Sequence, residues 1–345
     1  MAAGQSSPQP SPILFFETMR VYQLTAALKT ALELELFSAI AEGNTSAEAA
    51  ARRCQSSERG TRILCDFLVV IGFLTKENGC YGLTPDSAAF LDRRSPAYVG
   101  GAVEFLGCSA HAESFANLTD AVRRGGRPVG DEGSIVADNP DWVRFARGMA
   151  GLQKIPAERM AQAIAADTRQ TAGGPVRRVL DIAAGHGVYG ITLAQHCPDA
   201  EITAVDWPSV LEVAKENAQA AGIAGRYRTI PGSAFDVEYG SGYDVVLLTG
   251  FLHHFDPPTC EQLLRKVYSA LNPGGRAVTV EFVPNEDRVS PPVPATFSLM
   301  MLVSTPAGDA YTFSQLEKMF RNAGFRSSEQ HSLAPSLLSA LISRK

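Results

Sequence analysis

The sequence predicts an α/β protein in which a mostly helical domain precedes a doubly wound parallel sheet. From residue 176 onward, short apolar runs alternate with segments of helical periodicity. Such alternation is typical of βαβ units, which build parallel sheets. Before residue 170, apolar residues recur mainly at helical spacing. Because 345 residues exceed one ordinary domain, we expect a helical domain at 13–170 and a sheet domain at 171–345, after a disordered segment at 1–12.

The composition argues against nucleic acid and membranes as partners. The formal net charge is -5, and Lys and Arg do not cluster beyond adjacent pairs, whereas binding a phosphate backbone needs clustered cations. The longest apolar stretch, 63–74, is too short to span a bilayer and contains Asp66. The N-terminus lacks the pattern of a signal peptide, and the cysteines are scattered. We therefore expect a cytoplasmic protein with reduced thiols.

The first domain begins with a series of helices. Apolar residues at helical spacing predict one or two helices over 13–41. Thr45-Ser46-Ala47-Glu48 has the form of a capping box, with Thr45 as the cap of a short helix that ends near Arg53. Ser57 is expected to cap the next helix, over 58–71.

A hairpin follows these helices. Asn78-Gly79 lies between two short runs of β-forming residues and favours a tight turn, and Thr84-Pro85 then predicts the start of another helix. Helices followed by a hairpin form a winged-helix pattern, which in isolation suggests a DNA-binding regulator. The candidate recognition helix carries only Arg59 and Arg62 as basic residues. We therefore interpret the winged element as structural and keep the regulator as a remote alternative.

The rest of the chain supplies the boundary and the sheet. The stretch 123–133 is expected to be a loop, 142–166 a helix, and 168–175 the end of the first domain. Strands are predicted at 177–183, 200–205, 226–230, 243–249 and 275–282, helices at 187–196, 208–221, 258–271 and 313–323, and a final strand pair with an antiparallel edge at 325–332 and 337–343.

A glycine-rich turn is the clearest ligand-binding signal. Residues 179–190 read V-L-D-I-A-A-G-H-G-V-Y-G, a strand that runs into a turn opening a helix. Asp206 ends the next strand, where a carboxylate can accept hydrogen bonds from both hydroxyls of a ribose. The glycines also satisfy G-x-G-x-x-G, so a dinucleotide is an alternative, as is a purely packing role. Asp181 within the strand faces a cationic ligand better than a pyrophosphate, which favours S-adenosylmethionine.

Several longer motifs carry a family resemblance. In the first domain they are A-L-K-T-A-L-E-L-E-L-F-S-A-I, G-F-L-T-K-E-N-G-C-Y-G-L-T-P and F-A-R-G-M. In the second they are L-D-I-A-A-G-H-G, L-H-H-F-D-P-P-T-C, L-N-P-G-G-R and Y-T-F-S-Q-L-E-K-M-F-R-N-A-G-F. On these motifs the chain resembles the small-molecule O-methyltransferases of the plant caffeate type and the bacterial polyketide-tailoring type. The resemblance implies a Rossmann-like methyltransferase sheet, a winged-helix dimerisation domain, a homodimer, and S-adenosylmethionine converted to S-adenosylhomocysteine in secondary metabolism.

The resemblance also implies cofactor contacts. Gly185 and Gly187 would contact the aminoacid portion, Asp206 the ribose, and Trp207 the adenine. Where the family has an acid near the adenine, this chain has Ser233, which weakens the expectation there. The full expected cofactor set is Asp181, Gly185, Gly187, Asp206, Trp207, Ser233, Phe235 and Thr249.

His253 is the candidate general base. It follows the fourth predicted strand, at the edge where ligands of open parallel sheets bind. Glu281 ends the neighbouring strand and would orient and charge-stabilise the imidazole. Counted back from Cys260, the resemblance implies that His253 rather than His254 is the catalytic histidine. A hydrogen-bonded pocket histidine is the alternative. The family's second acid corresponds here to Ala310, so the base chemistry departs from the pattern.

The acceptor and the reaction leave alternatives open. A metal site on His253, His254 and Asp256 is disfavoured because adjacent strand residues point in opposite directions, so no metal is expected. O-methylation of a hydroxyl on an aromatic or polyketide-like small molecule is the main hypothesis. C- or N-methylation and a non-methylating enzyme that binds the same cofactor are the alternatives. The resemblance places the acceptor against Phe145, Met149, Phe297, Met300, Met301 and Thr305.

Overall fold

The computed structural model describes residues 10–128, 133, 136–170 and 175–345. Most of the segment 1–12, for which the sequence predicts disorder, therefore lies outside the described residues, as does part of the expected domain end at 168–175. The chain divides into two compact units, Met1–Val103 and Glu104–Lys345. In the described part no helix combines the length and the apolar composition needed to cross a bilayer.

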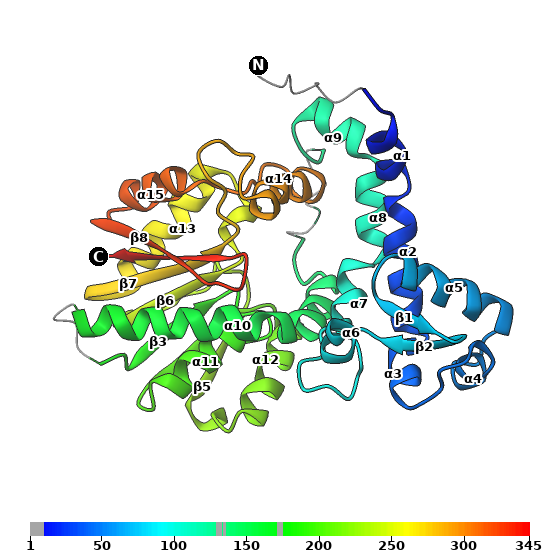
Figure 1. The fold of residues 1–345 in the computed structure, drawn as a ribbon. Coiled ribbons are helices and arrows are strands. Elements are labelled where there is room, and N and C mark those ends of the chain that lie inside the picture. The colour runs from blue at the N-terminus through cyan, green and yellow to red at the C-terminus, as the bar shows by residue number, and fades with distance from the viewer. Residues whose placement is uncertain (1–9, 129–132, 134–135, 171–174) are drawn as a thin grey trace, which may run out of the picture. The chain divides into compact units, whose positions relative to one another are not determined.

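The first unit contains helices followed by a two-stranded hairpin (Figure 1). Its core joins the helices to the hairpin through Phe37, Leu68 and Leu74. The hairpin turn has positive φ at Asn78 (48°) and Gly79 (81°), as the Asn-Gly pair predicts. The elements are α1 (Ile13–Met19), α2 (Val21–Glu33), α3 (Leu36–Ala41), α4 (Ala47–Arg53), α5 (Glu58–Val70), β1 (Leu74–Glu77), β2 (Cys80–Leu83) and α6 (Pro85–Phe90).

The helix caps of this unit agree with the sequence except at one residue. Ser57 accepts a hydrogen bond from the Gly60 amide and caps α5. Helix α4 is capped by Ser46, whose hydroxyl accepts from the amide of Ala49 at 3.1 Å, and the prediction of Thr45 was wrong. The reason is the hairpin: the Thr45 carbonyl accepts from the amide of Tyr81 at 2.8 Å, so the chain turns into the helix one residue later.

The second unit is built on a seven-stranded sheet in the order β5-β4-β3-β6-β7-β9-β8, parallel except at β9. Its elements are α7 (Val103–Leu106, at the division), α8 (Ser109–Ala116), α9 (Leu118–Arg124), α10 (Asp141–Gln170), β3 (Arg178–Ile182), α11 (Val188–His196), β4 (Glu201–Asp206), α12 (Pro208–Ala220), β5 (Tyr227–Pro231), β6 (Tyr243–Thr249), α13 (Pro257–Ala270), β7 (Leu271–Glu281), α14 (Pro292–Ser304), α15 (Phe313–Asn322), β8 (Ser327–Ser332) and β9 (Ser339–Arg344).

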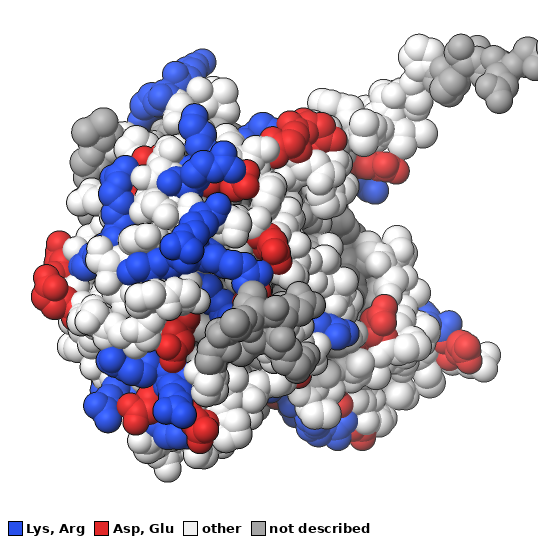
Figure 2. Space-filling model, turned by 90° about the vertical axis from the view of Figure 1, so that its left-hand side faces the viewer, with Lys and Arg blue, Asp and Glu red and all other residues white. Residues whose placement is uncertain are grey.

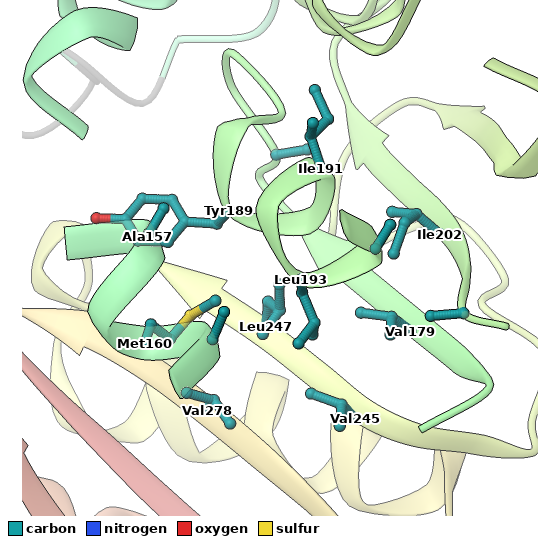
Figure 3. Packing of buried hydrophobic residues seen from close by; sticks show 14 of the residues in the cluster. Ala157, Met160, Val179, Tyr189, Ile191, Leu193, Ile202, Val245, Leu247 and Val278 are labelled. Atoms are coloured by element: carbon teal, nitrogen blue, oxygen red, sulfur yellow. The ribbon is translucent and has the colours of Figure 1, made fainter. Parts of the chain in front are cut away.

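Helices cover both faces of this sheet, so alternate residues of each strand enter different cores. Val179 and Val245 pack under α10, α11 and α12, whereas Leu180 and Val246 pack under α13 and α15. Figure 3 shows the first core, where Tyr189 of α11 points its ring toward Ala157 of α10. Because the strands are buried on both sides, they appear in the sequence as continuous apolar runs.

Helix α10 changes where the chain divides. It packs along α11 and contacts α12, so the compact division falls at 103/104 and not at the expected 170/171. The loop predicted from Arg123 begins after α9 ends at Arg124, and residues 129–132 and 134–135 lie outside the described part. The predicted final strand pair is present, with β9 inserted between β7 and β8.

A buried ion pair joins α10 to the amino edge of the sheet. Asp167 accepts from Arg276 of β7 at 2.6 Å and pairs with Arg344 of β9 at 2.5 Å. The opposite charges of Asp167 and the two arginines offset the desolvation of these groups.

Charged side chains also gather on one face of the molecule. Figure 2, which views the molecule from the left of Figure 1, shows Lys and Arg atoms on this face with Asp and Glu atoms among them.

Candidate active site

A cavity of about 660 Å³ lies at the carboxyl ends of the parallel strands. Its position is the one where open parallel sheets bind ligands, and its size is typical of a small-molecule site. Most of its lining is apolar or aromatic and comes from α10, α14 and the loops after β3, β4, β5, β6 and β7. The predicted residues that line it are Phe145, Met149, Gly185, Asp206, Trp207, Ser233, Phe235, Thr249, His253, Glu281, Phe297, Met300 and Met301.

The turn after β3 brings backbone close to the cavity. Ala183, Gly185 and Gly187 all have positive φ, at 54°, 57° and 72°, a conformation that glycine adopts without strain. Gly185 lines the cavity, and its amide donates to Oδ2 of Asp206 at 2.8 Å. A side chain added at Gly185 would first meet Phe145, at 3.7 Å. The half-buried Gly185 therefore presents backbone to the cavity, and a Cβ there would make only an ordinary contact with Phe145.

Two other glycines of the motif serve packing. A Cβ at Gly187 would lie 2.7 Å from the hydroxyl of Tyr227, and one at Gly190 would lie 2.6 Å from Oδ2 of Asp181. Gly187 is absent from the described lining of the cavity. The packing interpretation of the glycine motif therefore accounts for these two positions, whereas Gly185 faces the cavity.

Asp181 lies behind the cavity wall. Its side chain is fully buried, and Oδ2 accepts from the amide of Gly190 at 3.2 Å. Among the described residues, Oδ1 has no hydrogen-bond partner. Burial raises the pKa of this carboxyl to about 7. The sequence led us to expect Asp181 at the ligand, but the side chain is not part of the described lining.

Asp206 stands at the end of β4 with both oxygens held by the backbone. Oδ2 accepts from Gly185 and Oδ1 accepts from the amide of Trp207 at 2.7 Å. Each oxygen keeps a further lone pair with which to accept a hydrogen bond. Burial raises the pKa of Asp206 to about 6, so the group is mainly ionised at neutral pH. The carboxylate is positioned to accept two hydroxyl groups from a ligand.

Three further residues predicted to bind the cofactor, Ser233, Phe235 and Thr249, add polar and aromatic groups to the cavity wall. Ser233 accepts from the amide of Phe235 at 3.2 Å, so its hydroxyl hydrogen is available to the cavity that it lines. The ring of Phe235 packs edge-on against Phe255, with ring centres 5.0 Å apart. Thr249, the last residue of β6, also lines the cavity.

His253 and Glu281 form a closely held polar pair on the cavity wall. The His253 imidazole lies with Nδ1 at 2.5 Å from Oε2 of Glu281, and both side chains are almost fully buried. The other carboxylate oxygen accepts from the amides of Phe251 and Leu252, at 3.1 and 3.0 Å. Because a carboxylate can only accept, Nδ1 carries the hydrogen, and in the neutral ring Nε2 then has a free lone pair.

The neighbouring histidine has a different environment. The ring of His254 lies 4.3 Å from that of His253 and contacts the edge of Trp142. Burial, and secondarily the neighbouring His253, lowers the pKa of His254 well below its ordinary value. His254 is therefore neutral at physiological pH. In the described chain no group of three His, Cys, Asp or Glu side chains is arranged to hold a metal.

Phe297 of α14 packs against His253, and Met300 and Met301 of the same helix also line the cavity. The ring of Phe297 lies 4.9 Å from that of His253, edge to face, and 4.5 Å from that of Phe282. Thr305 was predicted to contact the methyl acceptor, but it is not part of the described cavity lining. It follows the last residue of α14, and its hydroxyl donates to the Met301 carbonyl.

The position of the family's second acid is occupied by a buried alanine. Ala310 is fully buried, and the neighbouring Asp309 pairs with Arg288 at 2.6 Å. Neither residue belongs to the described cavity lining. Glu281 is thus the carboxylate that holds His253.

Sequence reasoning missed part of the lining. His186, Gln153 and Tyr189 line the cavity beside the glycine turn, and Phe105 and Trp142 line it elsewhere. His186 lies between the two glycines of the motif, so its position alone was a usable signal. Gln153 gave none, because it faces the cavity only through the packing of α10 on α11.

Both parts of the chain match known protein families. The O-methyltransferase domain model matches residues 115–326, and the O-methyltransferase dimerisation domain model matches residues 16–93. The 3-hydroxy-5-methyl-1-naphthoate 3-O-methyltransferase of Streptomyces sahachiroi is 30% identical, over 94% of this chain and 93% of its own. The tetracenomycin polyketide synthesis 8-O-methyl transferase of Streptomyces glaucescens is 27% identical, over 89% of each chain.

Solved structures share the fold. The crystal structure of a candidate O-methyltransferase from Nostoc punctiforme matches with a TM-score of 0.93 and 51% identity, over 98% of this chain and 100% of that chain. Human N-acetylserotonin methyltransferase in complex with S-adenosylmethionine matches with a TM-score of 0.83 and 23% identity, over 99% of each chain, which shows the fold alone. Both domain models and a relative along nearly the whole length agree, so this chain belongs to the S-adenosylmethionine-dependent O-methyltransferases.

Proposed function

We propose that the enzyme methylates a hydroxyl of an aromatic or polyketide-like small molecule, with His253 as general base and Glu281 as its positioning residue. The observation that carries the proposal is the bond from Nδ1 of His253 to Glu281, on the wall of the cavity that also contains Gly185 and Asp206. A base oriented by a buried carboxylate is the arrangement that removes a proton from a hydroxyl.

The residues present fit S-adenosylmethionine. Gly185 presents backbone to the cavity without a side chain, and Asp206 keeps acceptor capacity for the two ribose hydroxyls. Trp207 and Phe235 supply apolar surface for the adenine, and Ser233 a hydroxyl. Asp181 would not contact the cofactor, because it lies behind the wall. When bound, the cofactor supplies an electrophilic methyl group on a sulfonium.

Glu281 sets the tautomer of the base. Its Oε2 accepts the Nδ1 hydrogen of His253, which leaves the Nε2 lone pair for the acceptor hydroxyl. The amides of Phe251 and Leu252 hold the carboxylate in place and stabilise its negative charge. As Nε2 takes the hydroxyl proton, the imidazolium that forms stays paired with Glu281, and the oxygen becomes the stronger nucleophile.

The apolar walls align the acceptor and exclude water. Phe297 contacts the ring of the base, and Met300 and Met149 also line the cavity. An in-line displacement depends on the alignment that such walls impose. Water removed from the oxygen nucleophile no longer stabilises it against reaction. Flat rings fit a wall of Phe and Met side chains, and two relatives act, by name, on a naphthoate and in tetracenomycin synthesis.

Transfer of a labelled methyl group tests the proposal. Purified enzyme is incubated with S-adenosylmethionine carrying a trideuterated methyl and with phenols, naphthols and anthracene-type phenols. We expect a product heavier by CD₃ in place of H, with the label on oxygen by NMR and an equal amount of S-adenosylhomocysteine. A label on carbon or nitrogen would favour the corresponding alternative. Consumption of the acceptor without label or S-adenosylhomocysteine would favour a non-methylating enzyme.

A further inference from the structure

His186 is a buried imidazole of the cavity wall that the reaction described above does not use. It lies in the glycine turn, between Gly185 and Gly187, and its side chain is 3% exposed. Nδ1 accepts a hydrogen bond from the amide of Val188 at 3.1 Å. Because an acceptor nitrogen carries no hydrogen, the hydrogen of the neutral ring is on Nε2.

Two aromatic rings stack against the imidazole. It stacks on Phe145 (ring centres 5.9 Å apart, planes at 18°) and on Tyr189 (6.1 Å, 29°). The carbonyl of His186 accepts from the side chain of Asn217 at 2.8 Å, which fixes the backbone. Burial lowers the pKa of the imidazole to about 4, so the ring stays neutral at physiological pH. His186 thus presents a preorganised neutral donor.

Gln153 offers a second neutral donor on the same wall. The hydroxyl of Tyr189 donates to Oε1 of Gln153 at 2.7 Å. This bond orients the amide and leaves its NH₂ group for a molecule in the cavity, which Gln153 and Tyr189 both line. Tyr189 therefore connects the two donors, because its ring stacks on His186 and its hydroxyl holds Gln153.

We propose that His186 Nε2–H and the Gln153 amide bind the carboxylate of the aminoacid portion of S-adenosylmethionine and S-adenosylhomocysteine. The inference rests on the cofactor of the proposed function and is independent of His253. Both donors are neutral, so they add no positive charge near the sulfonium. A Lys or Arg in their place would attract the carboxylate but repel the sulfonium, and would favour the product over the substrate form.

Two substitutions of His186 separate its two nitrogens. In His186→Asn the amide oxygen replaces Nδ1 as acceptor for Val188, but the Nε2 donor is lost. In His186→Gln the longer side chain carries an NH₂ group to about the position of Nε2. Calorimetry measures the binding of S-adenosylhomocysteine and of its decarboxylated analogue, which lacks only the carboxylate. Neither titration needs an acceptor or turnover, so a failure of phenol methylation leaves this test intact.

We expect His186→Asn to weaken S-adenosylhomocysteine binding about 10- to 100-fold, the size of a hydrogen bond to a charged group. The analogue should bind wild type and variant within about threefold, and His186→Gln should retain most of the affinity. Equal weakening of both ligands would show a structural role and overturn the proposal, as would unchanged binding of both.

Gln153→Glu supplies a second test should His186→Asn fail to fold. The new carboxylate still accepts from the Tyr189 hydroxyl, but it repels the ligand carboxylate and attracts the amine of the analogue. S-adenosylhomocysteine should therefore bind more weakly and the analogue more tightly than in wild type. A change of the same sign for both ligands would contradict the assignment.

Discussion

At the residue scale, Glu281 defines the chemistry of the cavity. It is 3% exposed and takes hydrogen bonds from two backbone amides and from His253. A buried carboxylate is costly without such partners, so its partners fix it rigidly. Its hydrogen bond to Nδ1 therefore holds the His253 ring in one orientation.

Glu281→Gln should separate catalysis from cofactor binding. The amide oxygen can still accept from Phe251 and Leu252, but the new NH₂ group donates toward Nδ1 of His253 and moves the ring hydrogen to Nε2. We expect kcat to fall by about 10²- to 10⁴-fold, as for loss of a general base, with S-adenosylhomocysteine affinity unchanged. Glu286→Gln is the control, since Glu286 also accepts from a backbone amide, that of Ser314, but does not line the cavity. Equal kcat in both variants would contradict the role of Glu281.

Asp181 should make stability depend on pH. Its pKa is raised from 3.8 to about 7 by burial, so between these values the folded protein holds a proton that the unfolded chain has lost. This group's contribution to stability therefore falls as pH rises, by about 1.4 kcal/mol per pH unit in that window. Asp181→Asn removes this contribution. The free energy of unfolding of the variant minus that of wild type, measured by urea titration, should therefore rise from pH 5 to pH 8. A pH-independent difference would show that Asp181 titrates alike in both states.

At the element scale, the turn between β3 and α11 combines a left-handed backbone conformation with close packing. Gly187 begins α11 in the left-handed region and packs against Tyr227 and Ala214. The same turn places Gly185 and His186 on the cavity wall. Changes to this turn should therefore affect stability and ligand binding together.

Two glycine substitutions separate strain from packing in this turn. Gly222 has nearly the same φ as Gly187, 73° against 72°, but a Cβ there would meet nothing within 4 Å. We expect Gly222→Ala to cost about 1 kcal/mol of unfolding free energy, and Gly187→Ala to cost about 1 to 3 kcal/mol more, because its Cβ would overlap Tyr227. Urea denaturation measures both. Equal losses would mean that the turn relaxes around the added methyl.

The strands of the sheet and the helices that cover it were predictable because each follows from a local sequence pattern. Tertiary contacts explain where the structure differs from the prediction. β3, α11, β4 and α12 begin and end within about two residues of their predicted bounds, which is as closely as the frayed ends of helices and strands can be defined. Ser46 replaced Thr45 as a cap because the hairpin holds Thr45 from a distant part of the chain. Likewise, the fold placed Asp181 behind the wall and Gln153 on it, and neither placement follows from local spacing.

At the scale of the whole molecule, the apolar surface of the first unit indicates self-association. None of the residues of α1 is buried, and Leu14 and Phe16 are 75% and 60% exposed. Exposed apolar patches of this kind mark protein interfaces, and the dimerisation domain model includes most of this helix. We propose that the chain forms a homodimer through this unit.

Charged substitutions on α1 test the homodimer. Wild type should have a mass of about twice the 36.9 kDa of one chain in light scattering. Leu14→Asp combined with Phe16→Asp should shift it toward one chain, because burying the new carboxylates in an apolar interface is costly. Val70→Asp, at an 83% exposed position of α5 in the same unit, is the control and should leave the mass unchanged. A wild-type monomer, or a dimer in the double variant, would contradict this interface.

The dependence of methyl transfer on the acidity of the acceptor tests the central claim most directly. The pair of acceptors is an ordinary phenol and a similar phenol whose electron-withdrawing group makes it ionise below the assay pH. His253→Asn can still donate to Glu281 but removes the base. We expect kcat/KM of this variant to fall about 10²- to 10⁴-fold with the ordinary phenol and less than about tenfold with the ionised one, which needs no base. Equal losses with both phenols, or no loss with either, would contradict His253 as the general base.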